Sequence, residues 1–236
     1  MNRRKTGMKL AIMQPYLFPY LGYFHLIHAV DSFVVFDDVN YIKGGWINRN
    51  YILSQGQRLL ITLPVRAASQ HRLINELEFA GREEKLLRTL RNCYSKAPQY
   101  DAVYPLIQDI LLSSERNLAR FLHDSLRRVC EYLDLNPRWH MSSALHKDPG
   151  LRGQAKILAI CEELSATHYI NAPSGQALYD RAAFNHRGIK LSFVQPRAVE
   201  YKQFSNAFAP NLSILDVIMF NDREQCSKML GAYDLV

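Results

Sequence analysis

The stretch LAIMQPYLFPYLGYFHLIHAVDSFVVFDDVNYIKGGWINRN, residues 10 to 50, decides the fold of this chain. Its first four residues are apolar and end at Gln14-Pro15, which predicts a strand buried on both faces. Residues 21 to 30 have apolar side chains at helical spacing, and residues 32 to 36 predict a second buried strand. A strand, a helix and a second strand in this order indicate a parallel β-α-β unit.

The remaining sequence extends this pattern on both sides of a helical region. Residues 51 to 65 predict a hairpin with a turn at Ser54-Gln55-Gly56-Gln57, and residues 73 to 79 alternate as in a short strand. Three apolar stripes with helical spacing fill residues 82 to 137, and Asn117 is a candidate cap for the third. Strand and helix patterns then alternate again from residue 138 onward.

We therefore predict an α/β fold with a mainly parallel sheet, either Rossmann-like or nucleotidylyltransferase-like, with a helical insertion in the middle of the chain. The expected organisation is a single compact domain with an N-terminal α/β half over residues 8–81, a helical insert over 82–137 and a C-terminal α/β half over 138–236.

The overall composition is that of an ordinary globular protein, with 48% hydrophobic and 22% charged residues. No apolar run approaches the roughly 20 residues of a membrane span, and no signal peptide is recognised. Four widely spaced cysteines form no metal-binding motif, so a reducing, cytoplasmic location is expected. The net charge of +7 fits phosphorylated substrates or an anionic surface, but the basic residues are dispersed, so DNA or RNA binding is not expected.

Four loops follow strand-like runs and are expected to converge at the carboxyl ends of the strands. In the second loop, Asp37 and Asp38 end an apolar strand, which suits a general base or an oxygen ligand of Mg²⁺. Asp38 is the candidate metal ligand, and Mg²⁺ with a nucleotide is the cofactor to consider. A turn or a helix cap is the alternative role for both aspartates.

The same loop continues with Lys43 and Gly44-Gly45 and then with Trp46, Asn48, Arg49 and Asn50. Arginine can bind phosphate or carboxylate with two parallel hydrogen bonds, and tryptophan can stack on a base or a sugar. This composition predicts a substrate-binding loop, with Arg49 as a candidate catalytic residue. A solvated turn with a packed tryptophan is the alternative.

The other loops supply further candidates. In the third loop, Pro173-Ser174-Gly175 is either a small anion-binding turn at a helix start or an ordinary turn. The remaining predicted substrate contacts come from the first and fourth loops, and they are Gln14, Tyr16, Tyr20, Tyr23 and Gln203. Asp216 is expected to be structural or to support a neighbouring group.

Four long motifs together resemble the WbqC-like protein family. They are QPYLFPYLGYFHLI, FDDVNYIKGGWINRN, YINAPSGQALYD and YKQF followed by FAPNLSILDVIMFN. The resemblance implies a component of bacterial lipopolysaccharide O-antigen or other surface-polysaccharide biosynthesis, without assigning catalytic roles to individual residues. The first motif is also similar, more weakly, to the opening of HIGH-motif nucleotidylyltransferases. Pro19, Gly22 and Tyr23 match that pattern, but both of its histidines are lost.

The function expected from these features is a transferase or ligase that uses a nucleotide-activated sugar or an acyl or aminoacyl donor. The alternative is a non-catalytic binding or scaffold protein for polysaccharide-synthesis enzymes, which predicts an apolar surface patch and no deep polar cleft. The expected partner is a small activated donor, and the choice between monomer and homodimer stays open.

Overall fold

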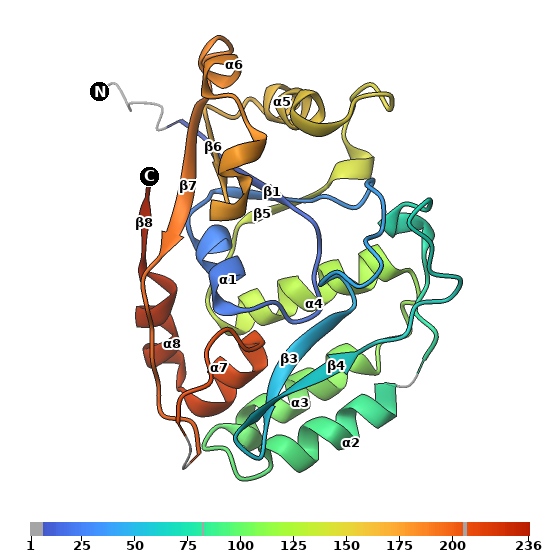
Figure 1. The fold of residues 1–236 in the computed structure, drawn as a ribbon, viewed down its shortest axis with the longest axis vertical. Helices are drawn as coiled ribbons and strands as arrows, with labels where there is room; N and C mark the ends of the chain where they lie inside the picture. Colours follow the sequence, from blue (N-terminus) through green and yellow to red (C-terminus); the bar gives the residue numbers. More distant parts are fainter. Residues whose placement is uncertain (1–6, 82, 205–206) are drawn as a thin grey trace.

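The computed structural model of the protein describes residues 7–81, 83–204 and 207–236. Six strands form the main sheet in the spatial order β5-β2-β1-β6-β7-β8, and all neighbouring pairs are parallel except β7 with β8 (Figure 1). The strands are β1 (Lys9–Met13), β2 (Ser32–Val35), β5 (Arg138–Met141), β6 (His168–Asn171), β7 (Lys190–Pro196) and β8 (Tyr233–Leu235). The prediction of an α/β fold with a mainly parallel sheet is confirmed, and this strand order is that of a Rossmann-like sheet.

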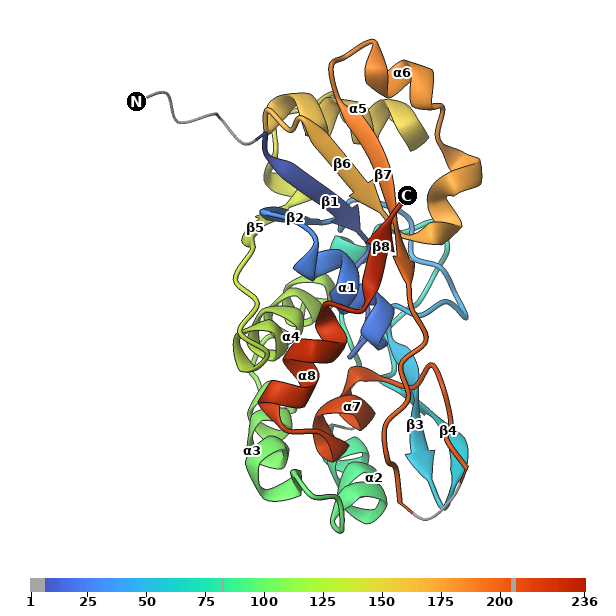
Figure 2. The same ribbon diagram turned by 90° about the vertical axis from the view of Figure 1, so that its left-hand side faces the viewer.

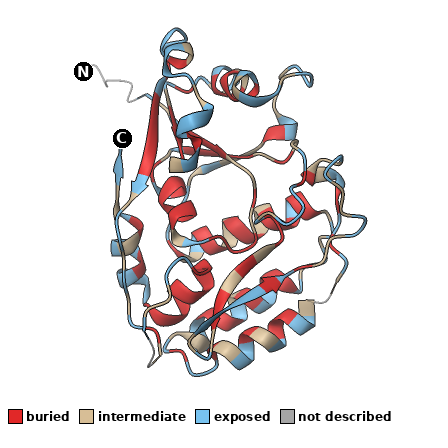
Figure 3. Cartoon of the chain, in the orientation of Figure 1, coloured by how far each residue is buried: buried red, intermediate tan, exposed pale blue. Residues whose placement is uncertain are grey.

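Helices cover both faces of the sheet (Figures 1 and 2). Alternate residues of β1 point to opposite sides, so Leu10 and Ile12 pack with α5 and α6, whereas Ala11 packs in the larger core with α1 and α4. Figure 3 shows the resulting buried interior on both sides of the sheet. The helices of these layers are α1 (Leu21–His28), α4 (Leu118–Tyr132), α5 (Gly153–Glu163) and α6 (Arg181–Asn185).

A second group of elements packs beside the α1 and α4 layer. It contains the antiparallel hairpin of β3 and β4, as predicted, with helices on one side of it (Figure 2). The larger core runs without interruption from the sheet into this group. The elements are β3 (Arg49–Ser54), β4 (Gln57–Thr62), α2 (Glu83–Tyr94), α3 (Tyr100–Leu111), α7 (Ile214–Phe220) and α8 (Arg223–Leu230).

Two local predictions have different outcomes. The Asn117 side chain accepts a hydrogen bond from the backbone N–H of Arg120, 3.1 Å away, and so caps α4 as predicted. The strand predicted over residues 73 to 79 is wrong, because Ile74–Glu76 form one turn of 3₁₀ helix. The turn is favoured locally, since the Glu76 carboxylate accepts a hydrogen bond from the Leu73 backbone N–H. Arg82, the first residue of the predicted helical insert, lies outside the described residues.

No helix within residues 7–81, 83–204 and 207–236 is long and apolar enough to cross a membrane.

Candidate functional site

The carboxyl ends of the parallel strands meet at one edge of the main sheet. From β1 the chain passes through α1 to β2 and then to β5, and it returns through α5 to β6 on the other side of β1. The strand order therefore reverses between β1 and β6, which is where open α/β sheets bind their ligands. The loop after β1 begins at Gln14 and the loop after β2 begins at Phe36, and the two loops start beside each other, because the Phe36 N–H donates to the Met13 carbonyl.

A pocket of about 380 Å³ lies between the loop after β1 and the β3–β4 hairpin. This volume is within the range of small-molecule sites, about 300–1,000 Å³. Four of the predicted substrate-binding residues line the pocket together with two that were not predicted. The lining residues are Tyr16, Tyr20, Trp46, Asn50, Arg58 and Asn211.

Two lining residues, Trp46 and Arg58, each take part in a contact between an aromatic ring and a guanidinium group, although their partners Arg49 and Tyr51 do not line the pocket. The guanidinium carbon of Arg49 lies 5.7 Å from the centre of the Trp46 ring, and that of Arg58 lies 4.3 Å from the centre of the Tyr51 ring. The Trp46 and Tyr51 rings are themselves 5.8 Å apart. Such a wall offers flat apolar faces for a sugar or a base and positive charge for an anionic group. Lys43, the other predicted cation of this loop, is exposed and does not line the pocket.

Asn48 and Asn50 use their side-chain amides inside the protein. Asn48 accepts from the Tyr41 hydroxyl at 2.8 Å and donates to the Leu63 carbonyl. Asn50 donates to the carbonyls of Leu17 and Phe18, 3.1 and 2.6 Å away, although it also lines the pocket. The Asn50 bonds join the hairpin to the loop after β1 and thereby fix the two walls of the pocket relative to each other.

The tyrosines of the first loop lie at different depths. Tyr23 is buried and donates to the Gln14 carbonyl at 2.8 Å, so it supports the loop from inside, and the Gln14 side chain is only partly buried. Tyr16 packs on Tyr23 with ring centres 5.6 Å apart, and Tyr20 is exposed. Burial raises the pKa of Tyr16, Tyr20 and Tyr23, so all three are neutral hydrogen-bonding groups near pH 7.

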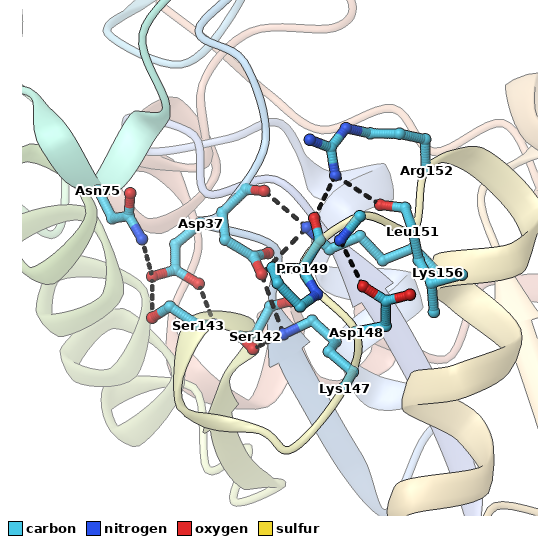
Figure 4. A network of polar contacts seen from close by, with 12 residues as sticks. Asp37, Asn75, Ser142, Ser143, Lys147, Asp148, Pro149, Leu151, Arg152 and Lys156 are labelled. Carbon is cyan, nitrogen blue, oxygen red and sulfur yellow. Dashed lines mark hydrogen bonds and ion pairs between the residues drawn. The ribbon is translucent and has the colours of Figure 1, made fainter.

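Asp37 and Asp38 lie in a polar network between the ends of β2 and β5. Figure 4 shows Asp37 of this network with Ser143 and Asn75. Asp37 is buried, and its carboxylate accepts hydrogen bonds from the backbone and side chain of Ser143, at 2.9 and 2.6 Å, and from Asn75 at 3.3 Å. Both of its oxygens are therefore occupied by the protein. This arrangement fixes the loop after β2 to the loop after β5.

Asp38 lies between two buried lysines that the sequence reasoning missed. Its Oδ2 is 3.0 Å from the Nζ atoms of both Lys147 and Lys156. Burial acts to raise the pKa of Asp38, but hydrogen bonds, those from the lysines among them, and the charge of Lys156 lower this pKa below its ordinary value. Asp38 is thus held as a carboxylate.

The surroundings of Asp38 do not fit the Mg²⁺ considered from the sequence. A divalent cation at Oδ2 would lie against two ammonium groups, and like charges at such distances repel. The neighbouring Asp37 carboxylate is already occupied by hydrogen-bond donors. No group of three or more His, Cys, Asp or Glu side chains is placed to hold a metal ion within the described parts of the chain.

Gln203 and Ser174 lie away from the pocket lining. Gln203 is buried, and its amide donates to the Asp216 carboxylate at 2.6 Å, which also accepts from the hydroxyls of Tyr94 and Tyr201. Burial raises the pKa of Asp216, and these three donors partly offset the rise. The network joins α2 and α7 to the segment after β7. Ser174 is exposed in the 3₁₀ turn Pro173–Leu178, after β6.

The residues that the sequence reasoning missed come from later parts of the chain. Arg58 was within the predicted hairpin, where it pairs with Leu53 and its guanidinium reaches the Tyr51 ring on the facing strand. Lys147 and Lys156 had no local signal, because their nearness to Asp38 depends on the pairing of β2 with β5.

Comparisons with known proteins agree with the resemblance read from the sequence. The model of the WbqC-like protein family matches residues 14–228, which include the loops after β1, β2 and β6. The chain is also similar to "Uncharacterized protein Rv1507c" of Mycobacterium tuberculosis (strain ATCC 25618 / H37Rv), with 31% identity over 223 residues that cover 90% of this chain and 93% of that protein. No solved structure gives a significant match. On these grounds, the chain belongs to the WbqC-like protein family.

Proposed function

We propose that this protein is a transferase or ligase of bacterial surface-polysaccharide biosynthesis that acts on a nucleotide-activated sugar or on an acyl or aminoacyl donor. The polysaccharide setting rests on the family resemblance. The observation that carries the chemical part is the pocket between the loop after β1 and the hairpin, where the Tyr16 and Trp46 rings lie with the Arg58 guanidinium.

The pocket suits an activated donor because such a molecule combines a flat or ring-shaped part with a negatively charged part. Trp46 and Tyr16 offer faces for the ring, and Arg58 offers a guanidinium that can bind phosphate oxygens. Among the catalytic candidates, Arg49 is the one that stacks on a pocket residue. Both oxygens of Asp37 and Oδ2 of Asp38 contact other protein groups, so we assign these aspartates to the support of the loop after β2.

Trp46 provides a direct test, because it is 44% exposed in the pocket and Trp139, on β5, is the second of the two tryptophans of the chain. In a Trp139→Phe variant, fluorescence then reports on the pocket alone. Titration with nucleotide sugars and with acyl-coenzyme A, each with and without Mg²⁺, is expected to give a saturable change for one class. Mass spectrometry of that ligand incubated with acceptor sugars then identifies turnover.

Two variants accompany this titration. Arg58→Met is expected to weaken donor binding at least tenfold. Trp46→Phe is the control, in which the fluorescence of the remaining Trp139 is expected not to change on titration. A charge-assisted hydrogen bond of about 1.5–3 kcal/mol justifies this magnitude. If no donor of either class alters Trp46 fluorescence, the enzyme assignment fails and the scaffold alternative gains support. Mass measurement in solution decides between monomer and homodimer.

A further inference from the structure

The Lys147–Asp38–Lys156 cluster holds more positive than negative charge within ion-pair distance. Both lysine side chains are only 4% exposed, and both ammonium groups contact the same carboxylate oxygen, Oδ2 of Asp38, at 3.0 Å. Asp37, which precedes Asp38 in the sequence, accepts its hydrogen bonds from Ser143 and Asn75. A buried cation without a full partner is costly, so an unbalanced pair of buried lysines calls for another negative group.

The hydrogen bonds of the two ammonium groups lead to the same conclusion. Each ammonium has three N–H donors. Lys147 bonds to the Ser142 carbonyl and to Asp38 Oδ2, and Lys156 bonds to the carbonyl and the Oδ2 of Asp38, its carbonyl contact being 2.7 Å. In the described parts of the chain one N–H of each lysine has no oxygen partner, although the Lys156 ammonium also lies 5.2 Å from the centre of the Phe36 ring.

The position of the cluster favours a ligand over a purely structural role. Asp38 follows β2, Lys147 follows β5 and Lys156 lies in the first turns of α5, which continues from β5. All three therefore lie at the carboxyl edge of the parallel sheet, where ligands of open α/β folds bind. Figure 4 shows Lys147 and Lys156 in this network. An anion there is shielded from solvent, so salt screens its attraction to the lysines less than at an exposed site.

We infer that Lys147 and Lys156 form an oxyanion site that holds the phosphoryl or carboxylate group of a substrate, with Asp38 setting the position of both ammonium groups. The site would hold the charged part of the substrate, and this role rests on the proposed function. Its test uses inorganic anions, and the lysine variants distinguish this site from Arg58 in the aromatic pocket.

The experiment is a calorimetric titration of the full-length protein with pyrophosphate, phosphate and acetate at constant ionic strength set by NaCl. We expect saturable binding, with thermal stabilisation that chloride does not give. Binding of phosphate or pyrophosphate assigns a phosphoryl group, and binding of acetate alone assigns a carboxylate. A wild-type protein that binds none of the three overturns the inference.

The deciding variants are Lys147→Met and Lys156→Met, each expected to bind the anion at least tenfold more weakly. Lys190→Met is the matched control, because Lys190 is an exposed residue at the amino end of β7, on the opposite edge of the sheet, and it is expected to bind as the wild type does. Lys147→Arg retains the charge and is expected to retain binding. Equal affinities in wild type and Lys147→Met overturn the inference.

Folding of the variants does not obscure the result. Lys147→Met leaves one lysine with one carboxylate, so it is expected to fold even if Lys156→Met does not. Arg58→Met separates the two proposals, because it removes the guanidinium of the aromatic pocket and is expected to keep inorganic anion binding at the two lysines. If the protein binds inorganic anions but Trp46 fluorescence does not respond to activated donors, the proposed function is wrong and the anion site stands.

Discussion

Asp38 has the environment of a charged group that the folded state stabilises. Its pKa lies below the ordinary value of 3.8, because hydrogen bonds and the Lys156 charge outweigh the effect of burial, which by itself raises this pKa. A carboxyl whose pKa is depressed by folding stabilises the protein above its unfolded pKa, and this stabilisation is lost as the pH falls through the folded pKa.

The predicted consequence concerns Asp38→Asn. The free energy of unfolding of the wild type is expected to exceed that of the variant at pH 7, and the difference is expected to narrow as the pH falls from about 4 downward. Urea denaturation of both proteins at pH 7, 4 and 3 measures this difference in the free energy of unfolding. A difference that stays constant over this range would show that the charge of Asp38 contributes nothing to stability.

At the scale of elements, a glycine in the first turn of α1 leaves room for the Tyr20 ring. The Tyr20 ring lies so close to Gly22 that a β-carbon at this position would overlap the ring. Tyr20 borders both the aromatic pocket and a second pocket of about 430 Å³ beside the segment after β7. The absence of a side chain at Gly22 therefore decides where a pocket wall lies.

For Gly22→Ala we expect the Tyr20 ring to move while the helix stays folded, because Tyr20 is on the surface and alanine favours helix. Donor binding measured by Trp46 fluorescence is expected to weaken at least tenfold, with little change in thermal midpoint. The control is Gly22→Ala combined with Tyr20→Ala, in which the overlap is removed. A single variant that binds like the wild type would refute this role of Tyr20.

The sequence predicted those elements whose signals are local. Buried strands, the hairpin and the Asn117 cap follow from side-chain spacing and from one capping residue. The segment at residues 73 to 79 misled the prediction, since its alternation resembles a strand, whereas Glu76 bonds back to Leu73 and closes a turn. The turn also has backbone hydrogen bonds from Glu76 to Leu73 and from Leu77 to Ile74, so local bonding replaces the strand there.

At the scale of the whole molecule, one apolar core joins the main sheet to the hairpin group. Phe33 of β2, Leu126 of α4, Ile52 of β3 and Ile218 of α7 belong to the same buried cluster. Elements that share a core this extensively are expected to unfold together.

The two tryptophans test this expectation, because Trp139 lies on β5 and Trp46 lies next to the hairpin. Single-tryptophan variants, Trp46→Phe and Trp139→Phe, are each expected to unfold in one transition. In each variant, the urea midpoint measured by fluorescence is expected to equal the midpoint measured by circular dichroism. Fluorescence midpoints that depart from the circular dichroism midpoint of the same variant would reveal two separately folding parts.

Prediction of the candidate site was limited by distance along the chain. Tyr16, Tyr20, Trp46 and Asn50 were predicted because all four lie in the first fifty residues, in chemically rich loops after two obvious strands. The lysines around Asp38 come from more than a hundred residues later, and only the pairing of β2 with β5 brings them close. Side-chain periodicity contains no information about that pairing.

The central position of β1 has a consequence for the timing of synthesis. One neighbour, β2, follows within a short stretch of chain, but β6, which pairs Lys9 with His168, is translated much later. At about 5–20 residues per second, the ribosome needs roughly 8 to 30 seconds to make the intervening chain. During this interval one edge of the nascent β1 has unpaired backbone groups and apolar side chains, which are open to pairing with other strands. The growing chain is therefore most vulnerable to aggregation, and most dependent on chaperones, before β6 leaves the ribosome.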